Sequence, residues 1–236
     1  DPGPLSLALI GEKVVVPSVA DAAKFAVQGR KDLLELAVER ERADSELEFV
    51  RKSADKAYRT ATRIDAALKD REGRGAYPQS PLAQRLWQIA RMIESDLGAH
   101  VYAVRLTGFD THSRQGNVHA TLLKILGDAL GAFYGDLKKC GLNDRVMTLT
   151  YSEFGRRVRE NRSLGTDHGK AAPMFCMGGA IKGGIHGKHP SLEKLSDGSL
   201  QHHTDFRQVY ATVLNRWIGS DSKNVLGAEY KPVPFV

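Results

Sequence analysis

The sequence has very few cysteines and no long apolar run, and each scarcity excludes a class of protein. Only Cys140 and Cys176 are present among 236 residues, far apart and outside any C-x-x-C pair, which excludes a disulfide-dense miniprotein. No apolar stretch approaches the roughly 18 residues of a membrane-spanning helix, so we expect no transmembrane segment. Hydrophobic residues make up 42% and charged residues 26% of the chain, which is typical of a folded protein and excludes a wholly disordered or collagen-like one.

Several well-known catalytic motifs are missing as well. There is no G-x-S-x-G nucleophile elbow, which disfavours an α/β-hydrolase. There is no P-loop and no G-x-G-x-x-G fingerprint, so a nucleotide-binding fold of those kinds is disfavoured too. Neither cysteine lies in a C-x-P-x-R context, which the modified-cysteine nucleophile of a sulfatase would require.

The net charge of +6 and the pI near 9.3 could indicate a nucleic-acid partner, but the distribution argues against one. Residues 30–74 hold twelve basic and eleven acidic side chains, a balance typical of solvated helices. The basic excess lies later, with no recognisable nucleic-acid motif beside it. It is either a solvated loop or a rim that attracts anions to a site, and its main members are Arg156, Arg157, Arg159 and Arg162.

Apolar periodicity predicts helices and short strands in alternation. Residues 29–72 read as a helical insertion or hairpin packed on the core of a single domain spanning 1–236. After it come six elements in the order helix, strand, helix, strand, strand, helix, and Ser80 caps the first of these helices. Their predicted ranges are 81–97, 101–106, 117–139, 146–150, 174–177 and 204–218. This order indicates an α/β fold with a largely parallel sheet, in which ligands gather beyond the carboxyl ends of the strands.

Two Asp–His pairs are placed where predicted strands end or begin. Asp110 and His112, two residues apart, face the same side of an extended chain, and Asp167 and His168 are flanked by glycines that allow both to turn to one centre. Each pair is either a set of metal ligands or an Asx-type turn beside a surface histidine. Carboxylate and imidazole donors suit zinc, manganese or iron. We therefore expect a divalent metal ion (zinc, manganese or calcium) on Asp110, His112, Asp167 and His168, where it could polarise a phosphoryl or sulfuryl oxygen and activate water.

Glu153 and Arg156 follow the strand predicted at 146–150 and are the candidate catalytic residues. Glu153 is either a ligand or general base, or a carboxylate that makes a structural hydrogen bond. Arg156 is either a clamp for phosphate or sulfate, whose oxygens match the guanidinium fork, or the partner of Glu160 in an ion pair.

At these residues the sequence resembles a known bacterial family. The resemblance is to the sulfatase-like domain-of-unknown-function family 1501, placed in the alkaline phosphatase superfamily, and it covers about residues 80–220 closely. It is carried by Gly108–His112, Ser152–Arg156, Gly165–Met174 and Thr204–Arg207.

The resemblance implies an alkaline phosphatase-like α/β/α sandwich and a particular use of the motifs. Asp110 and His112 resemble the superfamily's Asp/His pair on one metal. The Asp-His-Gly element of the superfamily's active enzymes matches Asp167-His168-Gly169 by letters, but by order along the chain it matches Ser152-Glu153-Phe154-Gly155. In the second alignment His168 resembles the last metal histidine, and Phe154 stands where an imidazole is expected.

The resemblance also implies that the chain is the carboxyl-terminal portion of an exported or periplasmic protein, without the strand that bears the nucleophile. No export signal is recognisable, since Asp1-Pro2-Gly3-Pro4 lacks a basic region and an initiating Met. The expected function is metal-dependent hydrolysis of phosphate or sulfate esters, with an anionic small-molecule or glycan ester as substrate and no nucleic-acid partner. The alternative is a non-catalytic binding or scaffold module that kept the fold and lost the metal chemistry.

Overall fold

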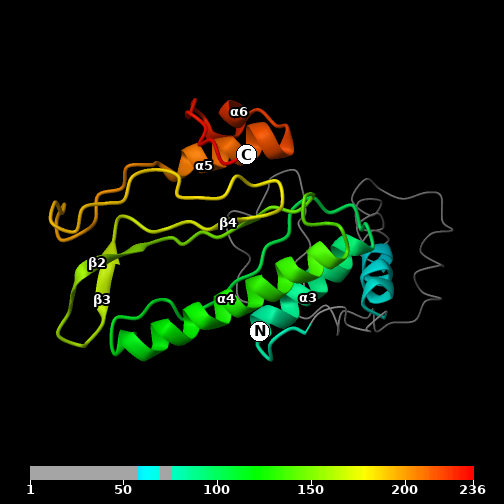
Figure 1. Ribbon diagram of the computed structural model, residues 1–236, viewed down its shortest axis with the longest axis horizontal. Coiled ribbons are helices and arrows are strands. Elements are labelled where there is room, and N and C mark those ends of the chain that lie inside the picture. Colours follow the sequence, from blue (N-terminus) through cyan, green and yellow to red (C-terminus); the bar gives the residue numbers. More distant parts are fainter. Residues whose placement is uncertain (1–57, 70–75) are drawn as a thin grey trace, which may run out of the picture. The chain divides into compact units, whose positions relative to one another are not determined.

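A computed structural model describes residues 58–69 and 76–236 of the chain (Figure 1). The chain divides into two compact units, and each is described by itself. The first comprises Asp1–Gly73 with Trp87–Ala103, and the second comprises Arg74–Leu86 with Val104–Val236. Most of the helical insertion predicted at 29–72 lies outside the described residues, but residues 58–69 are helical, as predicted.

The described part of the first unit has a small apolar core. Ile64 and Leu68, one helical turn apart, are 4% and 2% exposed, and Trp87, Met92 and Leu97 pack against them. The guanidinium of Arg63 donates to the backbone carbonyl of Asp96, at 3.1 Å. Ile64 and Leu68 lie on one face of the helical segment 58–69, and that face makes the apolar contact.

Helix α3, Pro81–Glu94, begins as the sequence predicts. The Ser80 hydroxyl accepts a hydrogen bond from the Ala83 amide at 3.2 Å, and Pro81 occupies the first helical position, where no amide hydrogen is needed. The helix ends three residues before the predicted end at Leu97.

Helix α4, Gln115–Lys139, is the longest element described. Its buried face contains Ala129, Phe133 and Leu137, whose spacing predicts such a face. The buried Asp136 accepts a hydrogen bond from the Tyr77 hydroxyl at 2.9 Å. The helix starts two residues before the predicted position, directly after Arg114, whose φ of 45° is left-handed.

Four short strands form two antiparallel pairs. β1 (Thr148–Leu149) pairs with β4 (Cys176–Met177), within the two strands predicted at 146–150 and 174–177. β2 (Gly155–Glu160) pairs with β3 (Thr166–Gly169), in a register that places Arg156 opposite His168. The described residues show only these antiparallel ladders, so the largely parallel sheet of a sandwich stays a prediction.

The sequence analysis assigned one strand wrongly and missed one hairpin. Residues 101–106 form no strand, although they are rich in β-branched residues, because a strand needs a hydrogen-bonded partner and none lies beside them among the described residues. The β2–β3 hairpin was not predicted, because its strands are polar on both faces and show no apolar alternation.

Three helical segments follow residue 205. α5 (Phe206–Thr212) continues as the π-helix η3 (Val213–Ile218), and α6 (Ser222–Leu226) follows. The N-cap of α5 is Asp205, one residue beyond the start of the helix predicted at 204–218. Its carboxylate accepts from the Arg207 amide, and Gln208 completes a capping box. In the part of the chain that is described, no helix has the length and apolar character needed to cross a bilayer.

Candidate metal centre

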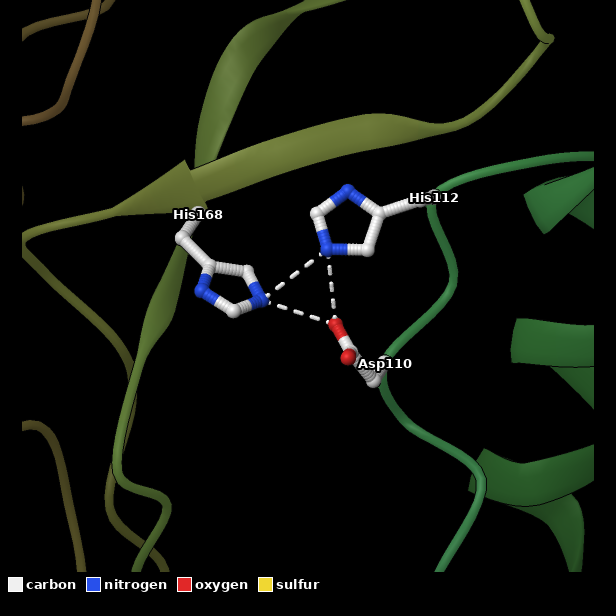
Figure 2. A group of neighbouring side chains, drawn as sticks. All are labelled: Asp110, His112 and His168. Atoms are coloured by element: carbon white, nitrogen blue, oxygen red, sulfur yellow. Dashed lines mark hydrogen bonds and ion pairs between the residues drawn. The ribbon is translucent and has the colours of Figure 1, made fainter.

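Three side chains from two distant segments converge on one point (Figure 2). Asp110 and His112 lie in the loop before α4, and His168 lies on β3. The Asp110 Oδ1 atom is 2.7 Å from His168 Nε2 and 2.9 Å from His112 Nε2, and the two Nε2 atoms are 3.1 Å apart. Three of the four residues expected to share one ion thus come together.

The spacing of these donor atoms is close to that of ligands around a single cation, although two of the three distances are shorter. Zinc ligands at about 2.0–2.2 Å from the ion lie roughly 3–3.5 Å from one another. Three protein donors would leave at least one coordination position of such an ion open, as catalytic rather than structural sites do. The side chains of Asp110, His112 and His168 are 60%, 48% and 47% exposed, so the donors are accessible to solutes.

The Asp110 carboxylate is held in its charged form. The hydrogen bond from His168 is the largest cause that lowers the pKa of Asp110; desolvation opposes it, and the charges of His112, His168 and Arg156 lower the pKa further. An ionised carboxylate is the form that binds a cation, so the site is prepared for metal at ordinary pH.

Arg156 joins the two segments that carry the donors. Its guanidinium donates to the carbonyls of Thr166, at 2.6 Å, and of Phe109, and lies 3.3 Å from Asp110 Oδ1. The side chain is only 17% exposed. Among the described residues it forms no ion pair with Glu160, which was one of the two predicted alternatives. These contacts make it a brace between the loop and β3, and its use as an anion clamp stays a prediction.

Phe154 stacks on the imidazole of His168. The ring centroids are 3.9 Å apart and the planes differ by 8°, while the Arg156 guanidinium lies 4.9 Å from the centre of the Phe154 ring. A phenyl ring has no lone pair for a metal, so it orients His168 by contact and supplies no donor of its own.

Asp167 and Glu153 do not join the three converging donors. Asp167 Oδ1 lies 3.8 Å from His112 Nδ1, on the ring edge that faces away from the other donors, and 3.2 Å from the side-chain nitrogen of Asn161. Glu153 is exposed, and its carboxylate makes no hydrogen bond or ion pair within the described ranges 58–69 and 76–236. Nothing in the sequence marks Asn161 beyond its residue type, which is common in turns.

Backbone hydrogen bonds fasten the hairpin loop to the start of α4. The amides of Arg114 and Gln115 donate to the carbonyls of Ser163 and Leu164, at 2.9 and 2.8 Å. Gly165 permits this approach, because a Cβ atom there would lie only 2.2 Å from the carbonyl carbon of His112. The two segments that carry the donors are thus held together by the main chain as well as by side chains.

The other described histidines lie apart from this triad. His119 packs edge-on against Phe109, with ring centroids 5.7 Å apart. His186 and His189 contact the carbonyls of Lys182 and Pro190. His203 lines a surface hollow of about 430 Å³ together with Lys188 and Lys231.

A hairpin fastened to the start of a long helix and an open Asp–His–His donor set together define a candidate metal-binding protein. The model of a family described as "Protein of unknown function (DUF1501)" matches residues 17–229, and the chain belongs to this family. No curated protein and no solved structure matches the chain.

Proposed function

We propose that this protein is a metal-dependent hydrolase of phosphate or sulfate esters whose ion is held by Asp110, His112 and His168. The observation that carries the proposal is the convergence of these donors within 3.1 Å of one another at an exposed position. The sequence resemblance to the alkaline phosphatase superfamily supports the substrate class, an anionic small-molecule or glycan ester, together with the sandwich fold and an exported location.

A divalent ion at this position would supply Lewis acidity, polarising an ester oxygen and lowering the pKa of bound water. The chain's own residues prepare the site. Arg156 braces the loop before α4 against β3, and Phe154 fixes the plane of His168. The exposed Glu153, two residues before β2, is the proposed general base.

The first experiment measures metal binding and hydrolysis together. Purified protein is titrated with zinc and with manganese and then assayed with chromogenic phosphate and sulfate esters. We expect one ion per chain, activity that depends on the ion, and loss of both in His168→Ala. The matched control is His189→Ala, which removes a histidine that contacts only the Pro190 carbonyl in the described structure and should behave as wild type. A wild-type protein that binds neither metal contradicts the proposal.

Phe154 favours a second candidate function. It occupies the position where one alignment to the superfamily expects an imidazole, and it contributes no donor. A binding module that retains one ion and has lost catalysis would show stoichiometric metal without turnover of any phosphate or sulfate ester. Metal-dependent turnover that disappears in His168→Ala eliminates this alternative.

A further inference from the structure

We infer that Asp167 and Asn161 are positioning residues: together they hold the His112 imidazole with Nε2 directed at the ion and Nδ1 directed at Asp167. The inference rests on the proposed function for the ion, but it assigns to Asp167 a different role from the ligand role predicted from the sequence. It also adds Asn161, which the sequence analysis did not identify.

The two ring nitrogens of His112 face different groups. Nε2 lies among the donors, 2.9 Å from Asp110 Oδ1 and 3.1 Å from His168 Nε2. Nδ1 faces Asp167 Oδ1 at 3.8 Å, within ion-pair range and longer than a hydrogen bond. A histidine that binds a metal through one nitrogen commonly donates the proton of the other to a carboxylate, which fixes the tautomer and the ring orientation.

Asn161 sets the position of Asp167 relative to His112. Its Nδ2 atom donates to Asp167 Oδ1 at 3.2 Å and to the backbone carbonyl of His112 at 3.0 Å. One amide group therefore contacts both the main chain of the metal-site histidine and the carboxylate that faces its ring.

The orientation of the Asn161 amide is fixed by its other contacts. Oδ1 accepts from the amides of Ser163 and Gly165, at 2.9 and 3.1 Å. The reversed amide would place its NH₂ group against two N–H donors, so only this orientation satisfies all four contacts. Because the same side chain closes the β2–β3 loop, the hairpin is tied directly to the geometry at His112.

The exposure of Asp167 distinguishes a positioning role at His112 from a role in the stability of the fold. The Asp167 side chain is 55% exposed and lies at the surface of the hairpin, so its removal should change the folded chain's stability little. Its loss should act on the metal site through His112. Changes at the outer partners of metal ligands typically cost about 10–100-fold in metal affinity.

The test compares zinc affinities, by competition with a chromophoric chelator, in Asp167→Ala, Asp167→Asn and the wild type. We expect Asp167→Ala to bind zinc about 10–100-fold more weakly. Asp167→Asn, which keeps an oxygen acceptor and loses the charge, should lie between the two. Asp128→Ala is the matched control, because it removes an exposed aspartate whose recorded partner is Lys124 on α4, and it should leave the affinity unchanged. Equal affinities in the wild type and both Asp167 variants would overturn the inference.

A second readout tests the orientation of the His112 ring in the metal-free protein, independently of zinc. Nuclear Overhauser contacts of the ring protons should show one orientation in the wild type, with Nε2 beside Asp110 and Nδ1 facing Asp167. These contacts should weaken or change in Asp167→Ala and Asn161→Ala, and an unchanged ring orientation in both variants overturns the inference. A wild type that binds no zinc contradicts the proposed function instead, and the ring orientation still decides the role of Asp167 and Asn161.

Discussion

Arg156 is the residue on which the geometry of the candidate metal centre depends most directly. A guanidinium presents several donors in a planar fork, so one side chain contacts two backbone carbonyls and the Asp110 carboxylate at once. Asp110, His112 and His168 were predicted as ligands from the residue types and their spacing. The role of Arg156 as a brace could not be predicted, because its partners are backbone atoms whose positions exist only in the folded chain.

Arg156→Lys tests this brace. Lysine keeps the charge but has a single donor group, so the carbonyls of Phe109 and Thr166 cannot both be satisfied. The free energy of unfolding should fall by about 1–3 kcal/mol, and zinc affinity should fall by roughly tenfold. Urea unfolding and chelator competition measure the two effects. Arg159→Lys, an exposed position on the same strand, is the control. An affinity equal to wild type in Arg156→Lys would show that the brace does not shape the site.

At the scale of elements, prediction succeeded where packing follows sequence periodicity and failed where polar contacts decide. α3 and α4 were predicted because apolar residues recur on one face over several turns. β2 and β3 have no such pattern, and their pairing depends on contacts of Arg156 and Asn161 with distant backbone atoms. The hairpin that carries His168 therefore could not be read from the sequence.

Gly165→Ala tests how closely the hairpin loop approaches the first segment. The added methyl group would meet the backbone of His112 and Ser113 at 2.2–2.5 Å, so the loop must move away. We expect a loss of about 1–3 kcal/mol in unfolding free energy, typical of overpacking, and weaker zinc binding. Gly183→Ala is the matched control, since its methyl group has open space. Thermal denaturation and chelator competition compare the two, and identical behaviour would refute the proposed close contact.

The cap of α5 gives a pH-dependent prediction. Hydrogen bonds from Arg207 lower the pKa of Asp205 to about 2. Because the folded pKa lies below the unfolded one, the stabilisation is complete above about pH 5 and is lost progressively as the pH falls through 4 toward 2. Asp205→Ala should cost about 1 kcal/mol at pH 6, and the gap to wild type should shrink in urea unfolding at pH 4 and then 3. Asp205→Asn keeps the cap acceptor and should show a smaller loss at pH 6. A gap that stays constant between pH 6 and 3 contradicts this account.

At the scale of the whole molecule, all the donors belong to one of the two compact units, the one comprising Arg74–Leu86 and Val104–Val236. The basic excess is partly used inside this unit, because Arg156 braces the metal site and Arg157 lies 3.6 Å from Asp197. Arg159 and Arg162 are exposed. Two of the four arginines in residues 156–162 therefore make contacts within the fold, and the other two are solvated. The absence of a nucleic-acid partner stays a prediction.

Metal binding should stabilise this unit by mass action. Zinc at about 100 times its dissociation constant should add about 2.7 kcal/mol to the free energy of unfolding, which calorimetry would register as a higher transition temperature. A chelator should reverse the shift, and His168→Ala should abolish it. If zinc leaves every thermal transition unchanged in the wild type, the triad does not bind zinc specifically in the folded state.

The separation of His112 and His168, 56 residues along the chain, gives a bound ion a mechanical role. It would act as a reversible crosslink between the start of α4 and β3, closing a long loop. The Arg114 and Gln115 amides, bonded to the hairpin loop, could then exchange their hydrogens with solvent only after the ion had left. Their exchange rates would report how often the crosslink opens.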